Sequence, residues 1–272
     1  MITYLFLFFA EKRFILEIVV IPIVVCLGAI LTFFSGFGLG TLMLPAFGLF
    51  FPLEVAIGAT AIVHLTNNVF KMSLLYKDID KEVLWRFGIP AILAAFLGSY
   101  ILVYLGSIPT LFSYSLYGKT YEISPIKLSI GVIMISFAIL ELFPVKGKLA
   151  LSKKHFILGG LLSGFFGGIS GHQGALRSMF LSKTSRSKEA FLATSGCIGL
   201  FIDIARLSVY SRQMNADLIS NQGSIILLAM VFAFAGTWIG KRLLKKTTMT
   251  GIQRTVGILL VVFGLLLALG IT

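Results

Sequence analysis

Ten apolar segments, separated by short polar loops, take up most of this 272-residue chain. Hydrophobic residues make up 57% of it and charged residues only 12%, whereas a typical soluble domain is about 25% charged. The mean hydropathy is +0.98. Since a helix needs about 20 apolar residues to cross the hydrocarbon core of a bilayer, the sequence predicts an all-α integral membrane protein.

Eight of the ten elements are expected to be full spans, and two are short or broken. Residues 107–124 form the main polar excursion, and residues 144–154 form a cytoplasmic linker. The apolar lead-in, residues 1–13, is either interfacial or an extension of the first span. The predicted elements are 14–34, 39–51, 54–76, 84–106, 125–143, 155–170, 173–183, 188–210, 223–241 and 250–271.

The two short elements, 39–51 and 173–183, each follow a glycine-broken run at a matching place in its half of the chain. The runs are Ser35–Gly40 and Gly168–Gly174. In secondary transporters, paired short or glycine-interrupted segments of this kind point to a substrate site near the membrane midplane.

Lysine and arginine fall mainly in the loops on one side of the predicted spans. If all ten elements cross, that side holds the basic residues of 77–86, 146–154, 183–188 and 241–254. The positive-inside rule places it in the cytoplasm, so both termini are expected outside the plasma (inner) membrane. With five elements in each half, 14–143 and 155–272, the halves are oppositely oriented. This predicts two inverted five-element repeats.

Matching residues in the two halves support the repeat. Asn68 and Lys71 fall opposite Asp203 and Arg206 at one constant offset. Further matches, weak singly but preserved in order, are Leu27–Leu31 with Leu158–Leu162, Ala59-Thr60 with Ala193-Thr194, and Gly98 with Gly236.

Ionisable side chains inside predicted spans are costly and usually face a cavity or a partner. The third element places His64, Asn67 or Asn68, and Lys71 along one helix face. The eighth carries Asp203 and Arg206 three residues apart, and the seventh carries Arg177. Three cations against one anion predict a positive interior that selects an anion. Two alternatives stay open: Lys71 and Arg206 snorkel to an interface, or Asp203 and Arg206 form a structural pair. Glu141 is expected at the interface, close to Lys146.

The starts of the two short helices, which follow the glycine-broken runs, support the hypothesis of an anion site. A helix that begins within the membrane exposes its first N–H groups and the positive end of its dipole. Two such starts brought together would form an anion cradle, although glycines also serve simply as close-packing surfaces. The candidate binding residues here are Gly38, Gly40, Thr41, Gly171, His172, Gln173 and Gly174, with Ser170 as a further donor; charge and further donors come from Lys71, Arg177, Arg206, Asn67 and Asn68.

The run Gly36–Gly40, then Leu44-Pro45, Ala59-Thr60 and a polar third span resembles the sulfite exporter TauE/SafE family. The second glycine-rich run, from Gly164 to Gly174, resembles the second glycine motif of that family. The resemblance covers roughly residues 25–245. It implies a multi-pass transporter of small sulfur anions such as sulfite, sulfoacetate or related sulfonates.

The expected function is therefore a secondary transporter of such an anion, working by alternating access. The alternatives are a passive anion channel and a drug/metabolite-type transporter of another organic anion. An enzyme is not expected, nor are a cofactor, a metal or nucleic acid as a partner. Partners are the anion, the bilayer and a coupling proton or sodium ion, and a homodimer is left open. Candidates for carrying a proton are His64, His172 and Asp203.

Overall fold

The structure is a computed structural model that describes residues 2–35, 38–143, 153–181, 185, 187–211, 222–243 and 249–272. Its described part holds ten helices of eight residues or more, close to the ten predicted elements. Their bounds are α1 Ile2–Ser35, α2 Gly40–Gly48, α3 Leu53–Leu75, α5 Ile89–Ser107, α6 Pro125–Leu142, α7 Phe156–Ser170, α8 Gly174–Leu181, α9 Lys188–Tyr210, α11 Gly223–Leu243 and α12 Met249–Ala268.

Six helical segments of the described chain are long and apolar enough to cross a membrane. The sequence predicts eight full spans, two more than these six candidates. The 15 residues of α7 extend only about 22 Å at 1.5 Å per residue. α12 has 20 residues, of which Val256–Ala268 form the apolar stretch among the described side chains. The two elements predicted to be short are short: α2 has 9 residues and α8 has 8.

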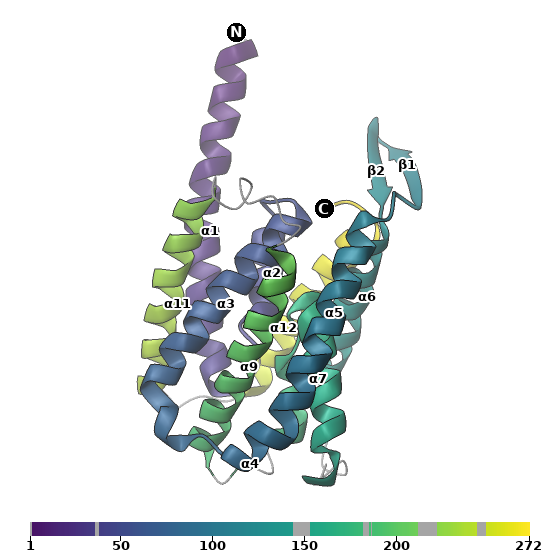
Figure 1. The fold of residues 1–272 in the computed structure, drawn as a ribbon. Coiled ribbons are helices and arrows are strands. Elements are labelled where there is room, and N and C mark those ends of the chain that lie inside the picture. The colour runs from purple at the N-terminus through teal and green to yellow at the C-terminus, as the bar shows by residue number, and fades with distance from the viewer. Residues whose placement is uncertain are drawn as a thin grey trace.

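The lead-in belongs to the first helix, because α1 runs without a break from Ile2. Residues 2–13 therefore extend the first helix beyond the candidate span Ile15–Phe33. In Figure 1 this N-terminal part of α1 extends beyond the rest of the bundle. The expected linker 144–154 lies outside the described residues up to 152, and Lys153–His155 form a short 3₁₀ turn.

The fold is helical, as the prediction of an all-α membrane protein states, apart from a β-hairpin in the polar excursion. Strands β1 Phe112–Leu116 and β2 Lys119–Ile123 pair antiparallel. The two loop residues, Tyr117 and Gly118, both have positive φ, at 52° and 74°, as the tight hairpin turn that suits twisted strands requires. Tyr114 Oη donates to the Leu269 carbonyl at 2.7 Å, which ties the hairpin to the end of α12.

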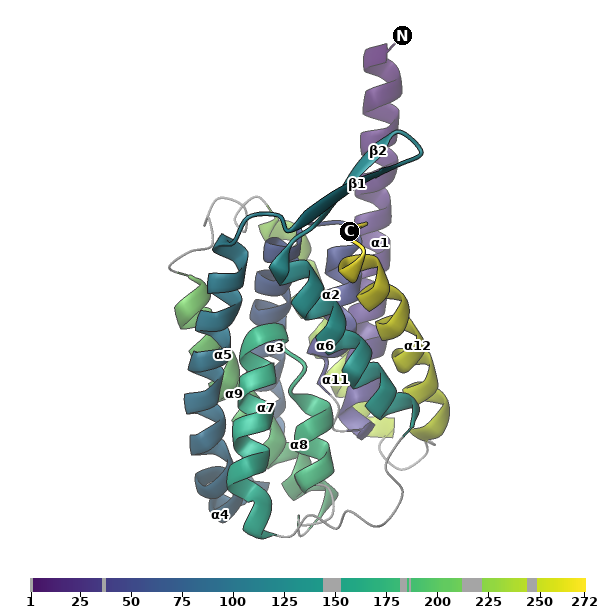
Figure 2. The ribbon, with the colours of Figure 1, turned by 90° about the vertical axis from the view of Figure 1, so that its right-hand side faces the viewer.

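Both termini lie at one end of the bundle, and the short helix α4, Lys81–Val83, lies at the other end (Figures 1 and 2). Polar contacts join the segments next to α4. Lys153 Nζ lies 2.6 Å from Glu82 Oε2, and the Asp80 N–H donates to Thr194 Oγ1 at 2.9 Å. The loop after α3 and the starts of α7 and α9 therefore share one end, which we call the basic end.

Small residues bring helix backbones together in four main pairs. α5 packs against α7, α1 against α11, α6 against α12, and α3 against α9. A Cβ on Gly98 would lie 2.2 Å from the Phe165 carbonyl oxygen, and one on Gly236 would lie 2.3 Å from the Cys26 carbonyl oxygen. Only glycine allows backbones this close, as is common between membrane helices.

Candidate functional site

The two glycine breaks lie against each other inside the bundle. A Cβ on Gly38 would lie 3.4 Å from the Gly174 nitrogen, and one on Gly40 would lie 3.2 Å from the Gly171 carbonyl oxygen. Gly171 ends α7 in the left-handed conformation, with φ of 77°, which glycine adopts without steric cost. The starts of α2 and α8 are therefore neighbours, as the sequence predicts.

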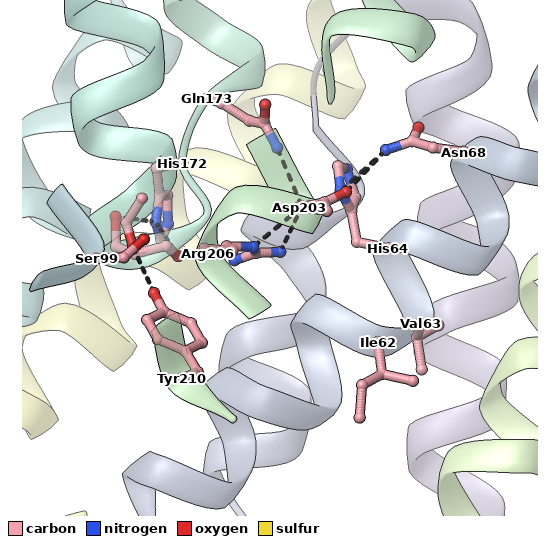
Figure 3. A network of polar contacts seen from close by, with 12 residues as sticks. Ile62, Val63, His64, Asn68, Ser99, His172, Gln173, Asp203, Arg206 and Tyr210 are labelled. Carbon is pink, nitrogen blue, oxygen red and sulfur yellow. Dashed lines mark hydrogen bonds and ion pairs between the residues drawn. The ribbon is translucent and has the colours of Figure 1, made fainter. Parts of the chain in front are cut away.

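Asp203 on α9 is the centre of a buried polar network (Figure 3). His64 Nδ1 lies 2.6 Å from Asp203 Oδ2, and Asn68 Nδ2 donates to the same oxygen at 3.1 Å. On the other carboxylate oxygen, Arg206 Nε donates at 3.0 Å and Arg206 Nη2 lies at 2.8 Å. Asp203, Arg206 and His64 are almost completely buried. Such a pair needs these extra hydrogen bonds to offset the cost of desolvation.

The second break joins this network through Gln173. Its Nε2 donates to Asp203 Oδ1 at 3.4 Å, and its Oε1 accepts from Arg177 Nη1 at 2.9 Å. Gly199 on α9 leaves room for the Arg177 guanidinium, because a Cβ there would lie 3.1 Å from Arg177 Nη1 and 3.0 Å from Asn68 Nδ2. Helices α3, α8 and α9 thus bring polar side chains to one place.

Two predicted residues lie beside the network without bonding to Asp203. Asn67 Oδ1 accepts from Thr237 on α11 at 2.7 Å. Lys71 is buried, with Nζ 5.7 Å from the centre of the Phe33 ring, and its stem packs where Gly196 leaves space on α9. The burial of Lys71 and Arg206 argues against the alternative that they snorkel to an interface. Asp203 and Arg206 do form an ion pair, as the structural alternative states.

Three of the expected side-chain donors are used within the protein. The Thr41 hydroxyl donates to the Gly38 carbonyl at 2.7 Å, and the Ser170 hydroxyl donates to the Phe166 carbonyl at 3.1 Å. Gln173 donates to Asp203, as described above. His172 is fully buried, its ring stacks on Phe137 with centroids 5.7 Å apart, and its Nδ1 lies 3.0 Å from Ser170 Oγ.

Other polar atoms near these groups have no hydrogen-bond partner among the described residues. Because buried polar groups are nearly always paired, these atoms mark where further hydrogen bonds are available. Thr60 shares the His64 face of α3 and lies beside Gly40. The atoms in this part of the bundle are Thr60 Oγ1, Ser195 Oγ, Arg177 Nε, Arg206 Nη1 and His172 Nε2; Arg206 Nη2 has the ion pair with Asp203 but no hydrogen bond.

Several residues of this region were not predicted. Tyr210 Oη donates to the Gly168 carbonyl, which also accepts from Ser99 Oγ at 3.3 Å, and Ser163 Oγ donates to the Gln173 carbonyl at 3.0 Å. These bonds support the carbonyl groups around the second break, and Figure 3 shows Ser99 and Tyr210 beside His172. Lone hydroxyls in apolar helices carry little sequence signal, since they commonly bond to their own helix backbone.

The network has more positive than negative formal charge. Lys71, Arg177 and Arg206 lie in it or beside it, and Asp203 is its carboxylate. Each cation is donor-only. The arrangement offers a negative oxygen-rich group several donors within a low-dielectric interior, where electrostatic interactions are strong.

Apolar helices that are broken where buried charges meet are typical of secondary transporters. The family model of the sulfite exporter TauE/SafE matches residues 20–267. The chain therefore belongs to the sulfite exporter TauE/SafE family, a family of membrane transporters rather than enzymes. No curated protein and no solved structure matches it.

Proposed function

We propose that the protein is a secondary transporter of a small sulfur-containing anion, such as sulfite, sulfoacetate or another sulfonate. The anion would bind at the membrane midplane between the starts of α2 and α8. The observation that carries the proposal is the contact of Gly38 with Gly174 and of Gly40 with Gly171, beside a buried Arg206. Membership of the family supports the substrate class.

The donors near the breaks suit a sulfonate or sulfite group. Such a group has three oxygens that accept hydrogen bonds, and a guanidinium presents donors in a planar fork that matches neighbouring oxygens. Arg177 Nε and Arg206 Nη1 have donor capacity that no described group uses. The first N–H groups of the two half-helices would add partial positive charge.

Asp203 suggests how the site is kept closed without substrate. Its carboxylate forms an ion pair with Arg206 in this structure. An entering anion would therefore compete with Asp203 for the Arg206 guanidinium. The exchange would release His64 and Asn68 from their present contacts with Asp203. A substrate that changes these contacts would bind the two conformations of the transporter with different affinities. Such a difference is what allows a ligand to drive a conformational change.

Reciprocal contacts support two inverted repeats, 14–143 and 155–272. Gly131 on α6 and Gly264 on α12 face each other: a Cβ on either one would lie within 2.9 Å of the carbonyl oxygen of the other. Asn68 and Asp203, matched by sequence, bond directly. The α5–α7 contact at Gly98 has its counterpart in the α1–α11 contact at Gly236.

These contacts also set the register of the proposed repeat. They place Phe165 on α7 in the position that Cys26 has on α1. In this register the segments Leu27–Leu31 and Leu158–Leu162, which match in sequence, are out of alignment by about two helical turns. The register from the contacts therefore replaces that sequence match. Transport would then be alternating access, in which one bundle moves against the other around the site.

The experiment is counterflow in proteoliposomes. Vesicles loaded with unlabelled sulfite should accumulate radiolabelled sulfite transiently, which a carrier does and a passive channel does not. Replacing Lys71, Arg177 and Arg206 by Gln, one at a time, should slow this uptake. Unchanged uptake in all three variants would refute the positive site.

A thermal-shift screen identifies the anion. Sulfite, sulfate, thiosulfate, sulfonates and carboxylates are compared, since a ligand that binds only the folded state raises its apparent stability. Stabilisation by carboxylates alone would favour the alternative, a transporter of another organic anion.

A further inference from the structure

Glu141, near the end of α6, is a buried acid away from the Asp203 network. It is 2% exposed, so neighbouring helices cover it at the end of α6 where the sequence predicts an interfacial position. Its Oε1 has no hydrogen-bond partner, and no ion pair involves it within the described ranges. Lys146, its expected neighbour, lies outside the described residues.

The elements packed around α6 offer Glu141 little compensating charge. α6 contacts α5, α7, α8 and α12. α7 has no charged residue, and the titratable groups of α5 are the exposed Tyr100 and Tyr104. On α8, Arg177 bonds to Gln173, and on α12, Arg254 is exposed.

The packing beside Glu141 is tight and apolar. A Cβ on Gly257 of α12 would lie 2.6 Å from Leu142 Cγ and 3.4 Å from the Ala138 carbonyl oxygen. Burying an ionised carboxylate without a partner is so costly that the group takes up a proton instead. The buried position without a partner therefore favours the neutral carboxylic acid form of Glu141.

One helical turn connects Glu141 to the candidate site. Phe137 precedes it by four residues, so the two share a face of α6. The Phe137 ring stacks on His172 in the second glycine break, and His172 Nε2 also has no hydrogen-bond partner in the described chain. Movement of the α7–α8 break against α6 would therefore change the surroundings of Glu141.

We propose that Glu141 is the proton-binding group that couples transport to a proton gradient. It holds a proton while buried, as in this structure, and releases the same proton when the alternate conformation exposes its carboxyl group to water. This role rests on the proposed transport function. His64 and Asp203 suit it less, because the Asp203 carboxylate is already compensated by Arg206 and His64.

The test compares two assays on the same proteoliposomes. Sulfite counterflow needs no proton gradient, whereas net accumulation under an imposed pH gradient does. A gradient of about one pH unit supports about tenfold accumulation when one proton moves with each substrate. Glu141→Gln, which mimics the neutral acid, should keep counterflow within about twofold of the wild type and lose the gradient-driven accumulation.

Glu141→Leu provides a second neutral variant, since an apolar side chain suits this position, and it should behave in the same way. Glu54→Gln is the matched control, because Glu54 is exposed on α3 and should retain both activities. Gradient-driven accumulation at the wild-type level in either Glu141 variant would overturn the proposal.

A measurement on the wild type guards against variants that do not fold. A pH-sensitive dye trapped in the vesicles should report proton movement together with sulfite. If net sulfite efflux from loaded vesicles occurs without proton movement, the role of Glu141 is refuted and the transport function stands. If no anion of the screen gives counterflow, the transport function itself fails.

Discussion

Gly38 and Gly174 touch across the centre of the bundle, so that no side chain separates the two broken segments. Each glycine stands beside the start of a short helix, α2 or α8. Two helix starts this close bring two partial positive charges together. In the proposed function, an anion bound between the two starts would relieve their mutual repulsion.

The first prediction concerns the helix contacts that hold the breaks in place. A Cβ on Gly164 of α7 would lie 1.9 Å from the Ala91 carbonyl oxygen of α5. Because a backbone atom cannot move aside cheaply, Gly164→Ala should cost about 1–3 kcal/mol and lower the melting temperature in detergent by several degrees.

Gly106→Ala on α5 is the matched control for this prediction. Its added methyl group would meet only Ile126 Cδ1, at 3.6 Å. Alanine favours a helix over glycine, so this melting temperature should stay the same or rise. An unchanged melting temperature for Gly164→Ala would mean that α5 and α7 do not pack as described.

The second prediction concerns Asp203. Asp203→Asn leaves the Arg206 guanidinium buried without its counter-charge, and breaking a buried pair in this way typically costs about 3–5 kcal/mol. The variant should show a large loss of thermal stability. Adding Arg206→Met to Asp203→Asn should restore part of it, since the double variant has no unpaired charge at this position.

Glu82→Gln is the control for the loss of an acid. Glu82 pairs with Arg86 and Lys153, but the pair is exposed, and surface pairs contribute only about 0–1 kcal/mol. Equal effects of Asp203→Asn and Glu82→Gln would contradict the buried network.

The helices could be predicted from the sequence because apolar runs, glycine breaks and basic loops each leave a local signal. α9 begins and ends at the predicted residues, Lys188 and Tyr210. The hairpin was also readable, since Phe112–Leu116 alternates and Tyr117-Gly118 suits a tight turn. The prediction of residues 107–124 as a polar excursion without strands does not include it.

The sequence predicts which residues form the candidate site, but it predicts only part of the hydrogen bonds between them. One helix face of α3 and the spacing of Asp203 and Arg206 indicate a shared site. The sequence cannot show that the Thr41 and Ser170 hydroxyls bond to their own helices. Nor can it show that α6 packing buries Glu141, because a charge next to a polar loop is usually interfacial.

The third prediction concerns Arg177, whose Nε has no partner in the described chain. Arg177→Gln should weaken sulfite binding about tenfold or more, because a hydrogen bond to a charged group contributes about 1.5–3 kcal/mol. Arg177→Lys should be intermediate, since it keeps the charge and loses the planar fork. A thermal-shift titration with sulfite measures both.

Arg86→Gln is the control here, because Arg86 is exposed and pairs with Glu82 at the basic end. Its affinity for sulfite should match that of the wild type. If Arg177→Gln also bound sulfite as the wild type does, Arg177 would have to be removed from the proposed site.

The last prediction concerns orientation in the membrane. The rule that basic loops face the cytoplasm places the basic end inside and the hairpin and both termini outside. Tyr117 at the hairpin tip is 97% exposed, so Tyr117→Cys should react with a membrane-impermeant maleimide on intact cells. Lys153→Cys, at the basic end, should react only after the membrane is permeabilised.

Both variants need a background without the native cysteines. Cys26 and Cys197 are free thiols within α1 and α9, and their replacement by Ala removes residual labelling. Because the hairpin is tied to α12 through Tyr114 and Leu269, its side of the membrane also reports that of the C-terminus. Labelling of Lys153→Cys but not of Tyr117→Cys on intact cells would invert the assigned orientation. The contacts between the glycine breaks would remain, but the half-helix that is reached from the cytoplasm would be α2 instead of α8.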